Sequence, residues 1–272
     1  MTLLKPVLLM LLLAVCDTAY SGSQTECKEK NLPTPQEVAL RTSQAHKLHD
    51  WLSQNNDDVV LLAREGQSMS DYGLQFSHAG YAIRTDGGQW LIYHNLNTCG
   101  TAESNLWIQG MYEFLDDDLS GHTIATLHFP PALQIHLKTV LTDPDLRRKL
   151  HNPHYNMVAP PFSLTTQNSN GWILMVFAAA NSSSVKSVVD GVTWLKAEYY
   201  IGSSVKVGNV KRALSDRFMV HMSTEGQPFP GVITFNSGDS LLGFMSRYGK
   251  SQVECDHGKF GSSVCMVPLG KF

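Results

Sequence analysis

The spacing of apolar residues along the chain predicts short strands interspersed with helices, without an internal repeat. Runs of strand length occur at residues 58–64, 77–84, 90–94, 123–129, 218–221 and 231–235. Helical spacing occurs at residues 34–52, 132–141, 144–150, 169–180 and 185–198. Residues 104–115 predict a short strand followed by a helix. This mixed order predicts an α+β fold in which an antiparallel sheet packs against helices.

The clearest local signal is a hairpin that carries two histidines. Residues 77–84 and 90–94 are strand-like, and the Asp-Gly-Gly sequence at residues 86–88 is typical of a hairpin turn. His78 lies near the start of the first strand and His94 at the end of the second. Antiparallel pairing brings those two ends together, so we expect the two imidazoles to share one patch of the sheet.

A polar turn leads into an apolar helix at residues 166–174. A hydroxyl at a helix start, combined with two histidines, is the outline of a nucleophile–base site. In this hypothesis His78 removes the proton of Ser169, His94 orients His78, and a backbone N–H near Asn170 holds the oxyanion. The alternative is structural: the histidines are polar groups satisfied within the sheet, and Asn168 or Ser169 caps the helix.

Composition and charge narrow the class of protein. The chain is 43% apolar and 17% charged, which is typical of a globular protein. A formal net charge of −3 without a basic stripe argues against a nucleic-acid partner. The acidic turn at residues 116–118 and the pair His151 and His154 lack the spacing of calcium or zinc ligands. We therefore predict no metal site and no cofactor.

The beginning of the chain predicts export. Residues 1–21 have the features of a signal peptide: a positive charge, an apolar run at residues 7–15 that is too short to span a bilayer, and a cut after Ser21. The alternative is a lipoprotein leader with Cys16 acylated, but Val15 stands where a small residue is expected. No later run is long enough to span a membrane, so we expect a periplasmic protein.

We expect residues 22–272 to form a single α+β domain. Its core should cover residues of about 34–200, and residues 201–272 should form a C-terminal extension with a cysteine loop. Four cysteines follow the leader, an even number that predicts disulfides in an exported chain. Cys255 and Cys265 flank a turn-rich loop and should pair with each other, which leaves Cys27 to pair with Cys99.

Several segments resemble a family of secreted bacterial proteins catalogued only as a domain of unknown function. They are residues 61–66, 72–80, 93–100, 107–110 and 167–172. The resemblance covers most of the mature chain and implies an exported bacterial protein without a known activity.

A second resemblance is to the permuted papain-like hydrolases, which include NlpC-type cell-wall peptidases and lecithin–retinol acyltransferase-like enzymes. Residues 78–81 (His-Ala-Gly-Tyr) are similar to their first motif, His94 to their second and residues 168–173 to their third. The resemblance implies a permuted papain-like core with His78, His94 and Ser169 at the catalytic positions. The ligand-binding residues that it implies are Tyr81, Asn168, Asn170 and Trp172.

The sequence departs from those enzymes at the nucleophile, because Ser169 stands where they carry cysteine. A cysteine thiol can be ionised by a helix N-terminus and an imidazolium, whereas a serine must lose its proton during the attack. We therefore favour an envelope protein that keeps the papain-like cleft, binds an unidentified small-molecule or peptide ligand, and is not catalytic. The alternative is a hydrolase of amide or acyl bonds, such as those of cell-wall peptide. The sequence does not indicate an oligomeric state.

Overall fold

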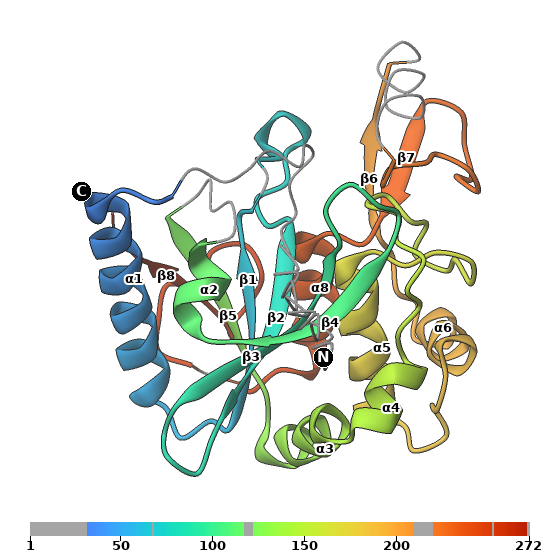
Figure 1. The fold of residues 1–272 in the computed structure, drawn as a ribbon. Helices are drawn as coiled ribbons and strands as arrows, with labels where there is room; N and C mark the ends of the chain where they lie inside the picture. Colours follow the sequence, from blue (N-terminus) through green and yellow to red (C-terminus); the bar gives the residue numbers. More distant parts are fainter. Residues whose placement is uncertain (1–31, 67, 117–121, 209–219, 252, 271–272) are drawn as a thin grey trace, which may run out of the picture.

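A six-stranded antiparallel sheet forms the centre of the computed structural model, which describes residues 32–66, 68–116, 122–208, 220–251 and 253–270 (Figure 1). The strand order is β4-β3-β2-β1-β5-β8. The bounds are β1 Val59–Arg64, β2 His78–Arg84, β3 Trp90–Asn97, β4 Ser104–Gln109, β5 Thr123–His128 and β8 Val264–Pro268. Two further strands, β6 Ser203–Lys206 and β7 Val232–Phe235, form a separate antiparallel pair.

Helices cover both faces of the sheet, which gives three layers. α1 Pro35–Ser53 and α2 Met111–Asp116 pack on one face. The other face is covered by α3 Pro131–Thr142, α5 Ser169–Asn181 and α8 Gly238–Met245. α4 Pro144–Lys149 adjoins α3, and α6 Val188–Ala197 packs on α5. Among the described residues there are also the short 3-10 helices η1 Ser70–Tyr72 and η2 Ser246–Tyr248.

Alternate residues of each strand point to opposite faces of the sheet. Leu61 and Tyr81 belong to the core on the α5 side, whereas Leu62 and Ala82 belong to the core on the α1 side. The unbroken antiparallel register from Val59↔Ile83 to Arg64↔His78 keeps this alternation along β1 and β2. The position of a residue in the register therefore decides which helices its side chain meets.

Two predicted helix starts are confirmed by their caps, whereas the helix predicted from residue 185 begins at Val188, after the Ser187 cap. Thr34 accepts a hydrogen bond from the Glu37 backbone, Glu37 bonds back to the Thr34 backbone, and Pro35 is the first helical residue of α1. Asn168 caps α5 through a hydrogen bond from the Gly171 N–H to its Oδ1, at 2.8 Å. α5 is buried on almost every side because it lies between the sheet, α6 and α8.

The segment after residue 200, which we expected to extend the core, contributes to the main sheet and core. β8 pairs with β5 at one sheet edge, and α8 packs into the α5-side core. The strand predicted at residues 218–221 is not found where the structure describes it. His221 lies in a turn, and its carbonyl accepts a hydrogen bond from the Met157 N–H instead of a ladder bond. Residues 218 and 219 lie outside the described part.

The predicted disulfide between Cys255 and Cys265 is confirmed, with the two Cα atoms 5.6 Å apart. Cys99 is also disulfide-bonded. Its predicted partner Cys27, the leader at residues 1–21 and Cys16 lie outside the described residues. None of the helices in the described part is long and apolar enough to cross a bilayer.

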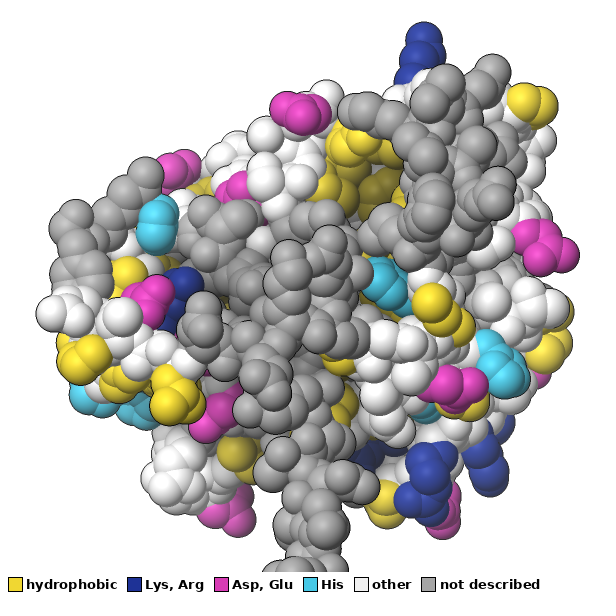
Figure 2. Space-filling view, turned by 45° about the horizontal axis from the view of Figure 1, so that its top comes forward, with side chains coloured by type: hydrophobic (Ala, Val, Ile, Leu, Met, Phe, Trp, Pro, Cys, Tyr) yellow, Lys and Arg dark blue, Asp and Glu magenta, His cyan; other side chains and the backbone are white. Residues whose placement is uncertain are grey.

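A third hydrophobic cluster joins the β6–β7 pair to the rest of the chain. Its buried members are Val158, Val205, Ile233 and Phe235, with Met69, Leu74, Val207 and Met222 packed against them. Figure 2 shows hydrophobic side chains lining a hollow on one face of the molecule.

Candidate functional site

The β2–β3 hairpin brings the two predicted histidines together. The backbones of β2 and β3 pair from Tyr81↔Tyr93 to Arg84↔Trp90, next to the turn. At the other end of the hairpin the side chains of His78 and His94 are in contact. His78 Nε2 lies 2.9 Å from His94 Nδ1, and His94 Nε2 lies 2.9 Å from Gln109 Oε1 on β4. The three side chains form one hydrogen-bonded chain across three neighbouring strands.

The direction of this hydrogen-bonded chain follows from its last acceptor. Because the Gln109 carbonyl oxygen accepts, the proton of His94 is on Nε2, and His94 Nδ1 must accept from the Nε2–H of His78. The lone pair of His78 is then on Nδ1. Within the described residues that atom makes no hydrogen bond. The hydrogen bond from Nε2 to His94 thus fixes the tautomer of His78 and leaves Nδ1 as the atom that could accept a proton.

Burial and a neighbouring cation oppose protonation of this pair. Burial, together with the positive charge of Arg64, lowers the pKa of His78 well below 6.5. The same two causes lower the pKa of His94 to about 3, although its hydrogen bond to Gln109 opposes the shift. Arg64 is itself fully buried, with its guanidinium over the ring of Phe114. Both imidazoles are therefore neutral at physiological pH.

Gly80 explains the glycine of the His-Ala-Gly-Tyr motif. A Cβ at this position would lie 2.7 Å from Ile92 Cγ2 and 3.3 Å from both His94 Cβ and Phe114 Cε2. Only glycine lets α2 and β3 approach β2 this closely. The rings of His78 and His94 both contact Phe114 of α2, so they lie on the α1 side of the sheet.

The structure does not bring Ser169 to His78. Ser169 is the first residue of α5, which packs on the opposite face of the sheet from the two histidine side chains. It is 8% exposed and makes no hydrogen bond to either histidine. The sheet itself separates the nucleophile from the base, which corrects the predicted pairing. Sequence order alone could not reveal this, because the face depends on strand register.

The predicted binding residues are used to hold the fold together. Asn168 donates to the carbonyls of Asn236 and Met157, and Asn170 donates to those of Ser77 and Asn236. The remaining two are also internal. The Tyr81 hydroxyl donates to the Ile173 carbonyl, and the Trp172 indole N–H donates to the Arg147 carbonyl.

The α5 side of β3 carries polar residues that the sequence analysis missed. Asn95 and Asn97 are 0% and 1% exposed, and neither the oxygen nor the nitrogen of either side-chain amide has a hydrogen-bond partner. By alternation they point away from His94, toward the face on which Leu106, the partner of Asn95, packs. Two asparagines spaced by two in an apolar strand were a visible signal for this cluster.

The α5 side of β4 also carries a serine–histidine contact. Ser104 Oγ and His151 Nε2 are 3.0 Å apart, and burial lowers the pKa of His151 to about 4. Ser104 also donates its backbone N–H to the Pro153 carbonyl. The contact holds the loop after α4 against the start of β4, and within the described residues no carboxylate bonds to His151.

Neither the curated proteins nor the solved structures with which the chain was compared gave a match. The model of one protein family matches residues 51–245, which include the two histidines, Asn95 and Asn97, and the start of α5. That span is more than half of the chain, and the chain thus belongs to the family described as "Uncharacterized protein conserved in bacteria (DUF2145)".

Proposed function

We propose that the protein is a non-catalytic binding protein of the bacterial envelope. In this proposal it shares the order of its motifs with the permuted papain-like hydrolases but not their chemistry. One observation carries the proposal: Ser169 and the His78–His94 pair lie on opposite faces of the same sheet. A general base must come within hydrogen-bond reach of the proton that it removes, and a sheet is not moved by loop closure.

The environment of His78 supports the same conclusion. An efficient general base has a pKa near the working pH. Burial and Arg64 hold the pKa of His78 far below that range. The alternative function, a hydrolase of amide or acyl bonds with Ser169 as nucleophile, therefore lacks both the geometry and a suitable base.

The ligand in this proposal is a peptide, such as the peptide of the cell wall, and its candidate contacts are the amides of Asn95 and Asn97. These residues are 0% and 1% exposed, so the segments that cover this face of β3 must move before the ligand reaches them. Buried polar groups without partners are rare in folded proteins, and a site that keeps them at a cost in stability is a candidate for binding. An asparagine amide offers one acceptor and a donor group, which match the N–H and C=O of a peptide. Residues two apart on a strand are about 6.6 Å apart and face the same side, which suits an extended ligand.

Export is part of the proposal and is supported by the chemistry of the cysteines. The Cys255–Cys265 disulfide and the bonded Cys99 are typical of an oxidising compartment such as the periplasm.

The first prediction concerns the reactivity of position 169. We expect Ser169→Cys to react with a thiol-directed acyl probe at a rate within about threefold of Ser237→Cys, because neither thiolate has an imidazolium partner. Ser237 is the matched control, since it is a buried serine at the N-terminus of another helix, α8. The measurement is the labelling rate, followed by mass spectrometry of the intact protein. Much faster labelling of the Ser169→Cys variant that also disappears in a His78→Ala background would refute the non-catalytic proposal.

The second prediction separates binding from stability. We expect Asn95→Val combined with Asn97→Val to leave the free energy of unfolding unchanged or to raise it by up to about 2 kcal/mol, because unpaired buried amides are removed. The same variant should lose sedimentation with purified cell-wall sacculi.

The matched control for this variant is Asn236→Val. Asn236 is buried, and its Oδ1 accepts a hydrogen bond from the Tyr200 hydroxyl at 2.9 Å. Its replacement should lower the free energy of unfolding by about 1–3 kcal/mol. Sacculus binding that survives in a stable Asn95/Asn97 variant would show that these amides are not the binding site.

A further inference from the structure

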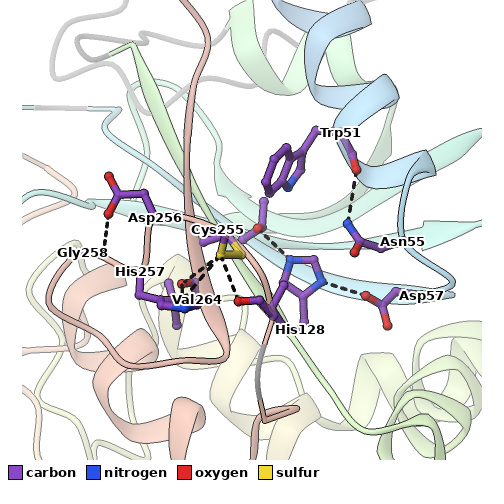
Figure 3. Close-up of a disulfide and its surroundings, with 12 residues drawn as sticks. Trp51, Asn55, Asp57, His128, Cys255, Asp256, His257, Gly258 and Val264 are labelled. Atoms are coloured by element: carbon purple, nitrogen blue, oxygen red, sulfur yellow. Dashed lines mark hydrogen bonds and ion pairs between the residues drawn. A yellow bond between two sulfur atoms is a disulfide. The ribbon is translucent and has the colours of Figure 1, made fainter.

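We propose that reduction of the Cys255–Cys265 disulfide creates a site for one thiophilic d10 metal ion, Cu⁺ or Zn²⁺, held by both sulfurs and a ring nitrogen of His257. The three potential ligand atoms all lie within 4.8 Å of one another. Figure 3 shows His257 beside the disulfide. The site shares no residue with the His78–His94 pair or with Asn95 and Asn97, so its test does not depend on the proposed function.

The distances match those of a metal centre. Metal bonds of about 2.3 Å to sulfur and 2.1 Å to nitrogen place neighbouring ligand atoms about 3.5–3.8 Å apart in a tetrahedral site. His257 Nδ1 already lies 3.4 Å from Cys255 Sγ. After reduction the two sulfurs, now bonded to each other, must separate, and the distance between the His257 ring nitrogen and Cys265 Sγ, which is within 4.8 Å, must settle near the same value. Thiolates together with an imidazole favour Cu⁺ and Zn²⁺ over harder cations.

The surrounding backbone combines a fixed ligand with an adaptable loop. Cys265 is fully buried in β8 and pairs with Thr126 of β5, so the sheet holds it in place. Cys255 and His257 are only partly buried and stand at the start of a loop that contains Gly258 and Gly261, both with positive φ. These glycines let the loop adjust by the small distance that the sulfurs must move.

His257 needs one tautomer change to serve as a ligand. In the oxidised protein its Nδ1–H donates to the Val264 carbonyl at 3.1 Å. Moving that proton to Nε2 frees the Nδ1 lone pair for a metal. His257 would then bind the metal as a neutral imidazole, which is the usual form of a histidine ligand.

The reaction balances with a dithiol as reductant. The dithiol transfers two electrons and two protons to the disulfide, which opens to the thiols of Cys255 and Cys265, and the reductant closes to its own disulfide. Binding of the metal ion then releases the two thiol protons, while His257 contributes an uncharged ligand. With the disulfide intact, Cys255 and Cys265 offer no thiolate and cannot form the site.

The experiment uses the purified chain in two forms, with the disulfide intact and after reduction under anaerobic conditions. Each form is titrated with Cu⁺ and, separately, with Zn²⁺ against a chromophoric competitor, and its fold is followed by circular dichroism. Because reduction also opens the disulfide of Cys99, the ion that reports the site is the one that depends on His257. We expect one such ion for each reduced chain and none for the oxidised chain. The comparison of the two titrations decides which ion the site prefers.

His257→Ala keeps both cysteines and tests the third ligand. It should weaken metal binding by the reduced chain by about 10–100-fold or more, since even the partners of metal ligands contribute that much. His154→Ala is the matched control, because His154 is an exposed histidine whose side chain lies beside Glu103. Equal binding by the oxidised and reduced chains, equal affinities of the two histidine variants, or unfolding of the chain on reduction would each overturn the proposal.

Discussion

Replacing Asp57 by alanine is expected to lower the free energy of unfolding by about 3–5 kcal/mol, the loss typical of removing one partner from a buried polar pair. Asp57 is 1% exposed. Its Oδ2 accepts a hydrogen bond from His128 Nδ1 at 2.7 Å, and its Oδ1 accepts one from Gln134 Nε2 at 2.6 Å. Lys250 Nζ lies 3.7 Å from Oδ1. Without the carboxylate, His128 Nδ1 would lose its acceptor, and Gln134 Nε2 would keep only its hydrogen bond to the Phe129 carbonyl.

The hydrogen bonds of Asp57 connect three parts of the fold. His128 also contacts Thr126 on β5, and Gln134 of α3 accepts hydrogen bonds from the Asp58 and Val59 N–H groups at the start of β1. Figure 3 shows His128 between Asp57 and the disulfide. Burial alone would raise the pKa of Asp57, but His128, Gln134 and Lys250 together lower it below 3.8. The carboxylate is thus charged, and its hydrogen bonds hold β1, β5 and α3 together where they meet.

Urea unfolding at neutral pH measures this loss, with Asp58→Ala as the control. Asp58 is the next residue, but its side chain is 55% exposed and pairs with Arg84 at the surface. Exposed ion pairs contribute about 0–1 kcal/mol, so the control should lose little. Equal losses in the two variants would mean that the buried network does not stabilise the fold as inferred.

Local order was predictable from the sequence because its causes are local. The Asp-Gly-Gly turn and the flanking apolar runs predicted the β2–β3 hairpin, and with it the meeting of His78 and His94. Cap residues and proline predicted where α1 begins. The Cys255–Cys265 disulfide followed from two cysteines on either side of a short loop.

Long-range order was not predictable in the same way. The face on which His78 points depends on the register of β2 against β1, and a shift of one residue would have turned it toward α5 and Ser169. β8 joins the sheet by pairing with β5, more than a hundred residues earlier in the chain, so no local pattern marks it as a sheet strand. The sequence therefore predicted the contact between the two histidines but not the face of the sheet on which they lie.

Acidification from pH 6.5 to 4.5 is expected to destabilise the protein strongly through the buried histidine pair. An unfolded histidine takes up a proton near pH 6.5, whereas His94 in the folded protein does so only near pH 3. The contribution of neutral His94 to the free energy of unfolding is therefore complete above pH 6.5 and is lost as the pH decreases toward 3. For His94 alone the loss by pH 4.5 is about 2–3 kcal/mol. His78, whose pKa is also lowered by burial and by Arg64, adds to the loss in the same direction.

Urea unfolding between pH 7 and 4.5 tests this with His94→Gln. The variant removes one titrating group, so we expect a lower free energy of unfolding at pH 7 and a shallower decrease as the pH falls. The difference in slope should correspond to close to one proton taken up on unfolding. His151, with a pKa of about 4, remains in both proteins and cancels in the comparison, and the carboxylate of Asp57 titrates below this pH range. A His94→Gln profile parallel to that of the unmodified protein would mean that the histidine pair accepts protons in the folded state, and the argument against His78 as a general base would then fail as well.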